Sequence, residues 1–174
     1  MRENSKGFTL VEAMITVIFF SLIVGACFLL SKVGNESWQV NSVRIGLAQE
    51  NRKALDWLMN ELRQSGASTI SNVPADGSWY NTISFKMATG ITSGKASWGD
   101  EVTYAIGGVN NDQLIRTQSG QERVIAHDFN TIQFKRLPAT PDIVEVAINV
   151  KRRTARANQE LDLGSNFKIK MRND

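Results

Sequence analysis

The sequence predicts an α+β protein in which a long N-terminal helix, first apolar and then amphipathic, packs on an antiparallel β-sheet head. Three observations favour this class. An apolar run covers residues 8–30 and contains one formal charge, Glu12. Residues 37–64 carry apolar side chains at helical spacing, and from Ala67 the pattern changes to short alternating runs. No proline occurs before Pro74, so nothing forces a break in the helix.

The apolar run at residues 8–30 would form a helix of about 35 Å, which is long enough to cross the core of a bilayer. A secretory signal peptide fits poorly, because the run is too long and Leu29-Leu30-Ser31-Lys32 makes a poor cleavage site. A plain single-pass anchor explains the length of the run. It does not explain Glu12, because a carboxylate within a membrane helix costs about 2.5–3.5 kcal/mol and is rare without a function.

The stretch Lys6-Gly7-Phe8-Thr9-Leu10-Val11-Glu12 closely resembles the processing site of the type IV prepilin-like superfamily. The resemblance implies that a membrane aspartyl peptidase recognises a leader ending in Lys6 and Gly7, cuts after Gly7 and methylates the new N-terminus, Phe8. It also implies that Glu12 is needed for methylation and for assembly. The chain then divides into a leader (residues 1–7), a transmembrane assembly helix (8–30), an amphipathic stem (31–66) and a periplasmic head (67–174).

The physical role of Glu12 follows from its distance to the new N-terminus. After cleavage Phe8 would carry an α-amino cation at the membrane edge, one helical turn from Glu12. Opposite charges attract strongly in low dielectric, and each is costly when left alone. The amine of a neighbouring subunit could pair with Glu12 and set the register of a filament. The alternative is that Glu12 pairs only with the amine of its own chain, four residues away.

The amphipathic stem should continue the first helix to a total of roughly 57 residues and stop near Gly66. We expect Trp57 in the core and Glu61 largely outside the apolar stripe. The stripe and its flank consist of Val40, Val43, Leu47, Ala54, Leu55, Leu58, Met59 and Leu62.

Alternating side chains predict six or seven short strands in one antiparallel sheet. Loops are expected at residues 68–81, 90–99 and 152–159, and turns at residues 107–112 and 119–120. The strands are expected within residues 83–87, 102–106, 114–117, 123–126, 132–135, 144–151 and 167–172.

Little in the sequence favours an enzyme, a cofactor or a metal site. The single histidine, His127, stands beside Asp128 and reads as a surface residue, and the single cysteine, Cys27, lies in the apolar run. The segment Asn110-Asn111-Asp112 could contact Ca²⁺, but it lacks the spacing of a calcium loop and a plain turn is favoured. We therefore expect no catalytic residues.

A basic cluster of Lys151, Arg152, Arg153 and Arg156 could contact DNA phosphates, but no aromatic side chain is interleaved with it. A solvated hairpin end is the simpler interpretation. The formal net charge of +3 gives no broad attraction for nucleic acid. No nucleic-acid partner is expected.

Two segments look like the larger minor subunits of this superfamily, in particular minor pseudopilin J of type II secretion and the W-type minor pilins. They are Leu58-Met59-Asn60-Glu61-Leu62-Arg63 at the helix end, and Val102-Thr103-Tyr104-Ala105-Ile106 leading into Leu114-Ile115-Arg116. The resemblance implies a structural subunit of the bacterial inner membrane that assembles at or near the tip of a filament. Its partners would be prepilin peptidase, other minor and major pilins or pseudopilins, and inner-membrane lipid. The alternative is a minor pilin whose head carries an adhesin or DNA-uptake role. The sequence leaves open which machine the filament serves.

Overall fold

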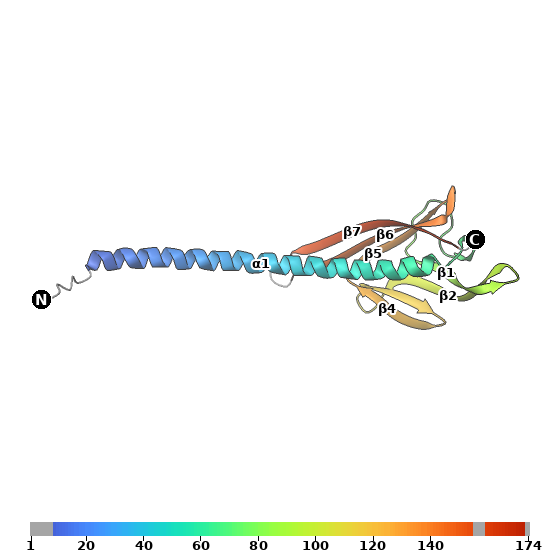
Figure 1. Cartoon of the computed structure of the whole chain (residues 1–174), viewed down its shortest axis with the longest axis horizontal. Helices are drawn as coiled ribbons and strands as arrows, with labels where there is room; N and C mark the ends of the chain where they lie inside the picture. The colour runs from blue at the N-terminus through green and yellow to red at the C-terminus, as the bar shows by residue number, and fades with distance from the viewer. Residues whose placement is uncertain (1–8, 155–158, 173–174) are drawn as a thin grey trace. The chain divides into compact units, whose positions relative to one another are not determined.

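The computed structural model describes residues 9–154 and 159–172 of the 174-residue chain. In this part of the chain it contains one long α-helix, a short 3₁₀ helix and seven β-strands (Figure 1). The chain divides into two compact units, Met1–Asn41 and Ser42–Asp174, and the division falls inside the long helix. The structure is therefore of the α+β class, as the sequence predicts.

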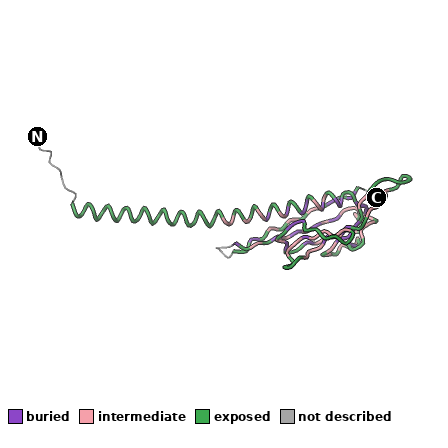
Figure 2. Tube along the Cα trace, turned by 90° about the horizontal axis from the view of Figure 1, so that it is seen from below, coloured by how far each residue is buried: buried purple, intermediate pink, exposed green. Residues whose placement is uncertain are grey.

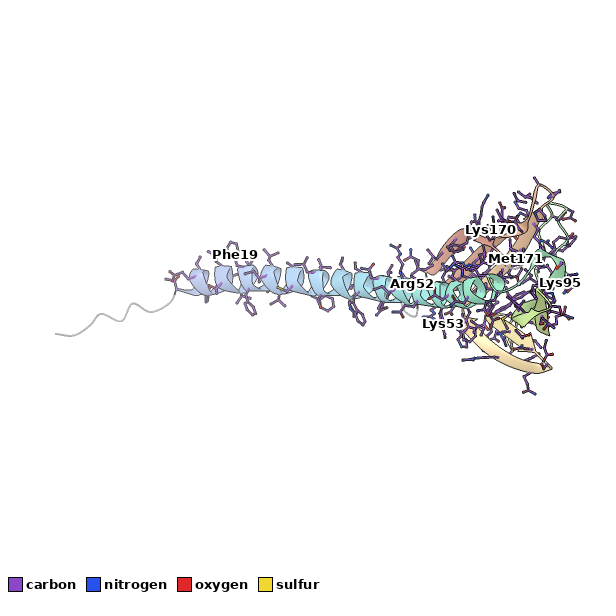
Figure 3. All side chains as sticks on the ribbon, turned by 45° about the vertical axis from the view of Figure 1, so that its right-hand side comes forward. Phe19, Arg52, Lys53, Lys95, Lys170 and Met171 are labelled. Atoms are coloured by element: carbon purple, nitrogen blue, oxygen red, sulfur yellow. The ribbon has the colours of Figure 1, made fainter. Side chains whose placement is uncertain are left out.

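Helix α1 covers Leu10–Leu62 and its first part lies in the N-terminal unit. Every described residue up to Trp38 is exposed (Figure 2). The apolar side chains point outward on all sides of the helix (Figure 3). A window of this segment has a mean hydropathy of 2.7, with none of it buried. By length and composition this helix can cross a membrane, a criterion that an N-terminal signal sequence also meets.

The C-terminal part of α1 belongs to the second unit and presents one buried stripe to the strands. The spacing of this stripe is that of one helix face, and it confirms most of the expected apolar stripe from Leu47 onward. Of the other expected members, Val40, Val43 and Met59 are half-buried. The helix ends at Leu62, earlier than the stop expected near Gly66, and the Ser65 hydroxyl donates to the Leu62 carbonyl at 2.7 Å. The buried residues are Leu47, Asn51, Ala54, Leu55, Leu58, Glu61 and Leu62.

The strands form two antiparallel sheets instead of the single sheet expected. The first sheet has the order β1-β2-β3-β4 and the second has the order β5-β6-β7. Only Asp128 separates β4 from β5, and its φ of 65° turns the chain sharply out of the first sheet. The strands are β1 (Ile83–Thr92), β2 (Lys95–Gly107), β3 (Gln113–Gln118), β4 (Gln121–His127), β5 (Phe129–Leu137), β6 (Thr140–Arg153) and β7 (Glu160–Lys170).

The loop expected at residues 90–99 is instead the end of the β1–β2 hairpin. Ser93 and Gly94 form its two-residue turn with positive φ angles of 54° and 78°, the geometry that suits a tight hairpin. None of the residues of this hairpin end is buried, so it shows no apolar alternation. The expected turn at Ser119 and Gly120 is confirmed, again with positive φ at both residues.

The core of the second unit lies between the C-terminal part of α1 and the inner faces of both sheets, which flank the helix in Figure 1. Asn51 Nδ2 donates to Ser165 Oγ on β7 at 2.8 Å, and Glu50 Oε2 accepts from the His127 backbone N–H on β4 at 2.8 Å. The rings of Phe85 and Tyr104 stack at 6.1 Å. The expected inward face of β6 is confirmed, with Val144, Val146, Ile148 and Val150 buried.

Candidate functional site

The Glu12 carboxylate lies in the first turn of α1 and forms a capping box with Thr9. The backbone N–H and the Oγ1 hydroxyl of Thr9 both donate to Glu12 Oε2 at 2.9 Å. In return the Glu12 backbone N–H donates to Thr9 Oγ1 at 3.2 Å. This reciprocal arrangement satisfies donors that the first turn of a helix leaves unpaired. The charge of Glu12 alone does not predict this cap, whereas the Thr-x-x-Glu spacing of residues 9–12 does.

The second carboxylate oxygen of Glu12, Oε1, accepts no hydrogen bond from any described residue, and no cation in the described ranges pairs with this side chain. Lys6, Gly7 and Phe8 lie outside the described residues, so pairing of Glu12 with its own N-terminus is outside the structure as well. The described geometry is therefore a carboxylate with one oxygen held by the cap and one oxygen available.

The surface around and beyond Glu12 is apolar on every side of the helix. The hydroxyls of Thr16 and Ser21 donate back to the carbonyls of Glu12 and Val17 at 2.7 Å, so their polar atoms need no outside partner. The exposed fractions of the large apolar side chains from Leu10 to Val33 run from 48% to 79%. Such a surface is stable only against lipid or against other apolar helices.

A second charged cluster lies in the head, where Glu61 is buried, contrary to the expectation that it falls outside the stripe. Arg116 Nε on β3 donates to Oε1 and Oε2 of Glu61 at 2.9 and 3.0 Å, and the Tyr104 hydroxyl on β2 donates to Oε2 at 2.7 Å. Arg116 Nη2 also donates to Gln118 Oε1 at 2.7 Å. The strands supply these partners, which is why the helical pattern alone could not locate them.

Burial and the hydrogen bond to Glu61 raise the pKa of Tyr104 far above its ordinary value. The phenol therefore stays protonated and acts only as a donor. Both oxygens of Glu61 are occupied by groups of the same chain, and the cluster joins α1 to β2 and β3. The cluster therefore acts as a structural link within the head.

The basic cluster at the end of β6 is paired with carboxylates. Arg152 Nη2 donates to Asp128, which raises the pKa of the guanidinium, while Lys151 and Arg153 lie 3.4 and 3.8 Å from the carboxylate oxygens of Glu160. Arg156, the fourth residue of the cluster, lies outside the described residues. These ion pairs favour the interpretation as a hairpin end over a phosphate-binding surface.

The remaining candidates stand apart from one another. His127 is exposed, whereas the adjacent Asp128 side chain turns to Arg152. Asn111 adopts a positive φ of 52° in the turn after β2, and residues 9–154 and 159–172 contain no group of three or more metal-ligating side chains. Trp57 is half-buried, not fully in the core as expected, and the Arg123 guanidinium lies over its ring at 4.7 Å from the centroid.

The described candidates thus separate into an N-terminal carboxylate on an apolar helix and a head whose main charged groups are paired internally. One carboxylate oxygen of Glu12 and the apolar surface of its helix remain available to other molecules. No family model matches the chain, and no curated protein or solved structure is significantly similar to it.

Proposed function

We propose that the chain is the precursor of a type IV pilin-like structural subunit, of the minor pseudopilin or minor pilin kind. One observation carries this proposal. The motif from Lys6 to Glu12 stands directly before and within the start of a helix whose apolar surface has no partner in the described residues. A signal peptide explains neither the length of the run nor Glu12, and a plain anchor does not explain Glu12.

In this proposal prepilin peptidase removes residues 1–7 and methylates the amine of Phe8. The mature N-terminus then carries a cation one turn from Glu12. Glu12 Oε1 is the oxygen that would accept a hydrogen bond from this amine or from that of a neighbouring subunit, because Oε2 already accepts from Thr9. The pair would form at the edge of a membrane, where water competes weakly for either charge.

The apolar helix supports assembly by a second physical route. Removing its outward side chains from water favours lipid before assembly and the helices of neighbouring subunits afterwards. The precursor would insert once in the bacterial inner membrane, with the head in the periplasm. The head would then contact other subunits at or near the tip of a filament.

The test is the intact mass and N-terminal sequence of the membrane-extracted chain, co-expressed with prepilin peptidase or with a catalytically inactive peptidase. We expect loss of residues 1–7 and one added methyl group on Phe8, only with the active enzyme. A Gly7→Leu variant should remain uncut, because a side chain then stands at the cleaved bond.

Two results would contradict the proposal. A chain that retains Met1 in the presence of active peptidase would be a simple anchored domain. A chain cut near Ser31 would be a secreted protein with an unusually long signal peptide. Neither result bears on the structure of the head.

A further inference from the structure

A cleft of about 340 Å³ opens in the head between strands β2 and β5. Its walls include Ile106 of β2 and Ile132 of β5, and its polar lining includes Asn81, Asn111, Asn130 and Thr131. None of its lining residues carries a charge. The cleft lies apart from the Glu61 cluster and from the N-terminal segment on which the proposed function rests.

The edge of β5 is unpaired at Ile132. Two residues further on, Phe134 exchanges both of its backbone hydrogen bonds with Tyr80, at 2.7 and 2.9 Å, on the side away from β6. Backbone groups alternate along a strand, so the N–H and C=O of Ile132 point to this same side. After Tyr80 the chain leaves β5 to begin β1 at Ile83, and no described residue bonds to the Ile132 backbone there.

The edge of β2 is unpaired at Ile106 for a similar reason. The carbonyl of Ser84 accepts from the Ser71 N–H at 3.0 Å, so the backbone groups of Ser84 point away from β2. By alternation Ile83 bonds with Tyr104 across the β1–β2 ladder, and Ile106 points to the same side as Tyr104. Strand β1 begins at Ile83, so among the described residues Ile106 has no strand partner on that side.

Polar side chains complete the cleft. Within the part of the chain that the structure describes, the side chains of Asn111, Asn130 and Thr131 have no hydrogen-bond partner. Asn81 Oδ1 accepts from Gln133 Nε2 at a long 3.3 Å. Carboxamides and hydroxyls both donate and accept, as the two unpaired backbone edges do.

We propose that this cleft binds an extended, uncharged polypeptide segment of a partner protein, which adds backbone hydrogen bonds at Ile132 and Ile106. A peptide backbone offers one donor and one acceptor per residue, and an unpaired strand edge is a template for it. An anion would find no cation in the lining and a metal ion would find no carboxylate. The inference is independent of the proposed function, because it concerns the head alone.

The test is residue-resolved amide hydrogen exchange of the full chain in detergent micelles. Without ligand, the amides of Ile106 and Ile132 should exchange faster than those of Ala105 and Gln133, which lie inside the ladders. The probe is the capped peptide acetyl-Ser-Val-Ser-Val-Ser-Val-amide at millimolar concentration. It should slow exchange at Ile106 and Ile132 by about tenfold. The same peptide with proline in place of valine lacks half of the N–H donors and should have no effect.

Three variants sharpen this test. Ile132→Pro removes a donor that takes no part in the β5–β6 ladder, but it also replaces a buried side chain. In a variant chain whose β6 amides stay protected, the peptide should no longer slow exchange at Ile106. Asn130→Ala should weaken the response several-fold. The matched control Asn166→Ala, an exposed asparagine on β7 outside the cleft, should leave it unchanged.

The proposal is overturned if Ile106 and Ile132 are already protected without peptide, or if the proline peptide acts as strongly as the valine peptide. Protection by an uncharged sugar such as maltotriose, with none by the peptide, would also overturn it. If an Ile132→Pro chain keeps the amide protection of β6 and the peptide still slows exchange at Ile106 fully, the unpaired edge of β5 takes no part in binding. None of these outcomes depends on processing at Gly7.

Discussion

Helix α1 carries two glutamates whose surroundings are opposite. Glu61, near the C-terminal end, is 8% exposed and both of its carboxylate oxygens bind Arg116, with Tyr104 as a further donor. Glu12, in the first turn, is exposed and one of its oxygens binds only Thr9. Arg116 thus neutralises the charge of Glu61, whereas Glu12 has only the hydrogen bonds of the cap.

The difference shows where each carboxylate can obtain a cation. A carboxylate that leaves water is costly unless it is paired and hydrogen-bonded. In the head, the strands bring Arg116 from far along the chain to Glu61. The apolar segment has no such neighbour among the described residues. Under the proposed function, the cation for Glu12 is the amine of the processed N-terminus or of another chain.

The largest effect is expected from breaking the internal pair with Glu61→Ala. The substitution leaves Arg116 without its carboxylate in a mostly buried place, so we expect the free energy of unfolding of the head to fall by about 3–5 kcal/mol. Urea unfolding of the full chain in detergent, followed by tryptophan fluorescence, measures it. The control is Asp56→Ala, which removes an exposed carboxylate from the same helix and should have almost no effect. Equal losses in the two variants would mean that the Glu61 cluster contributes no stability.

The second prediction separates charge from capping at the other end of the helix. Glu12→Gln keeps a cap acceptor but loses the charge. Thr9→Val loses the hydroxyl of the cap but keeps the charge and the backbone N–H that donates to Glu12 Oε2. If pairing with an amine drives assembly, Glu12→Gln should reduce the sheared filament fraction about tenfold, which corresponds to about 1.4 kcal/mol. Thr9→Val should reduce it much less, and neither variant should change the stability of the head. Equal reductions of the filament fraction in the two variants would instead mean that Glu12 acts only through the capping box.

The smallest effect concerns a third carboxylate, Glu145, which is half-buried and paired with two lysines. Lys135 and Lys168 donate to it at 2.8 and 2.7 Å, and these hydrogen bonds lower the pKa of its carboxyl below the ordinary 4.5. The stabilisation is therefore present above about pH 4.5 and is lost as the pH falls through the lowered pKa. Because solvent screens the pair, we expect a few tenths of a kcal/mol. Urea midpoints measured from pH 6 to pH 3 should fall less steeply in Glu145→Gln; parallel curves would contradict this expectation.

Much of the fold could be predicted from local patterns. The alternation in residues 144–150 correctly places the buried valines of β6, and Ser119-Gly120 correctly predicts a hairpin turn. The hairpin end at residues 90–99 could not be recognised, because none of its residues is buried and no apolar period marks it. The division into two sheets was also hidden, because alternation shows which face of a strand is buried and not which strand lies beside it.

By itself the sequence determined the apolar N-terminal helix, the position of Glu12 within it, the stripe from Leu47 onward and the α+β class. These features depend on the spacing of neighbouring residues. Only the tertiary structure decided that Glu61 is buried against Arg116, that Arg123 covers Trp57, and that Ile106 and Ile132 leave two strand edges facing one cleft. Each of these joins residues far apart in the chain, and their meeting depends on how the strands pair and where each one begins.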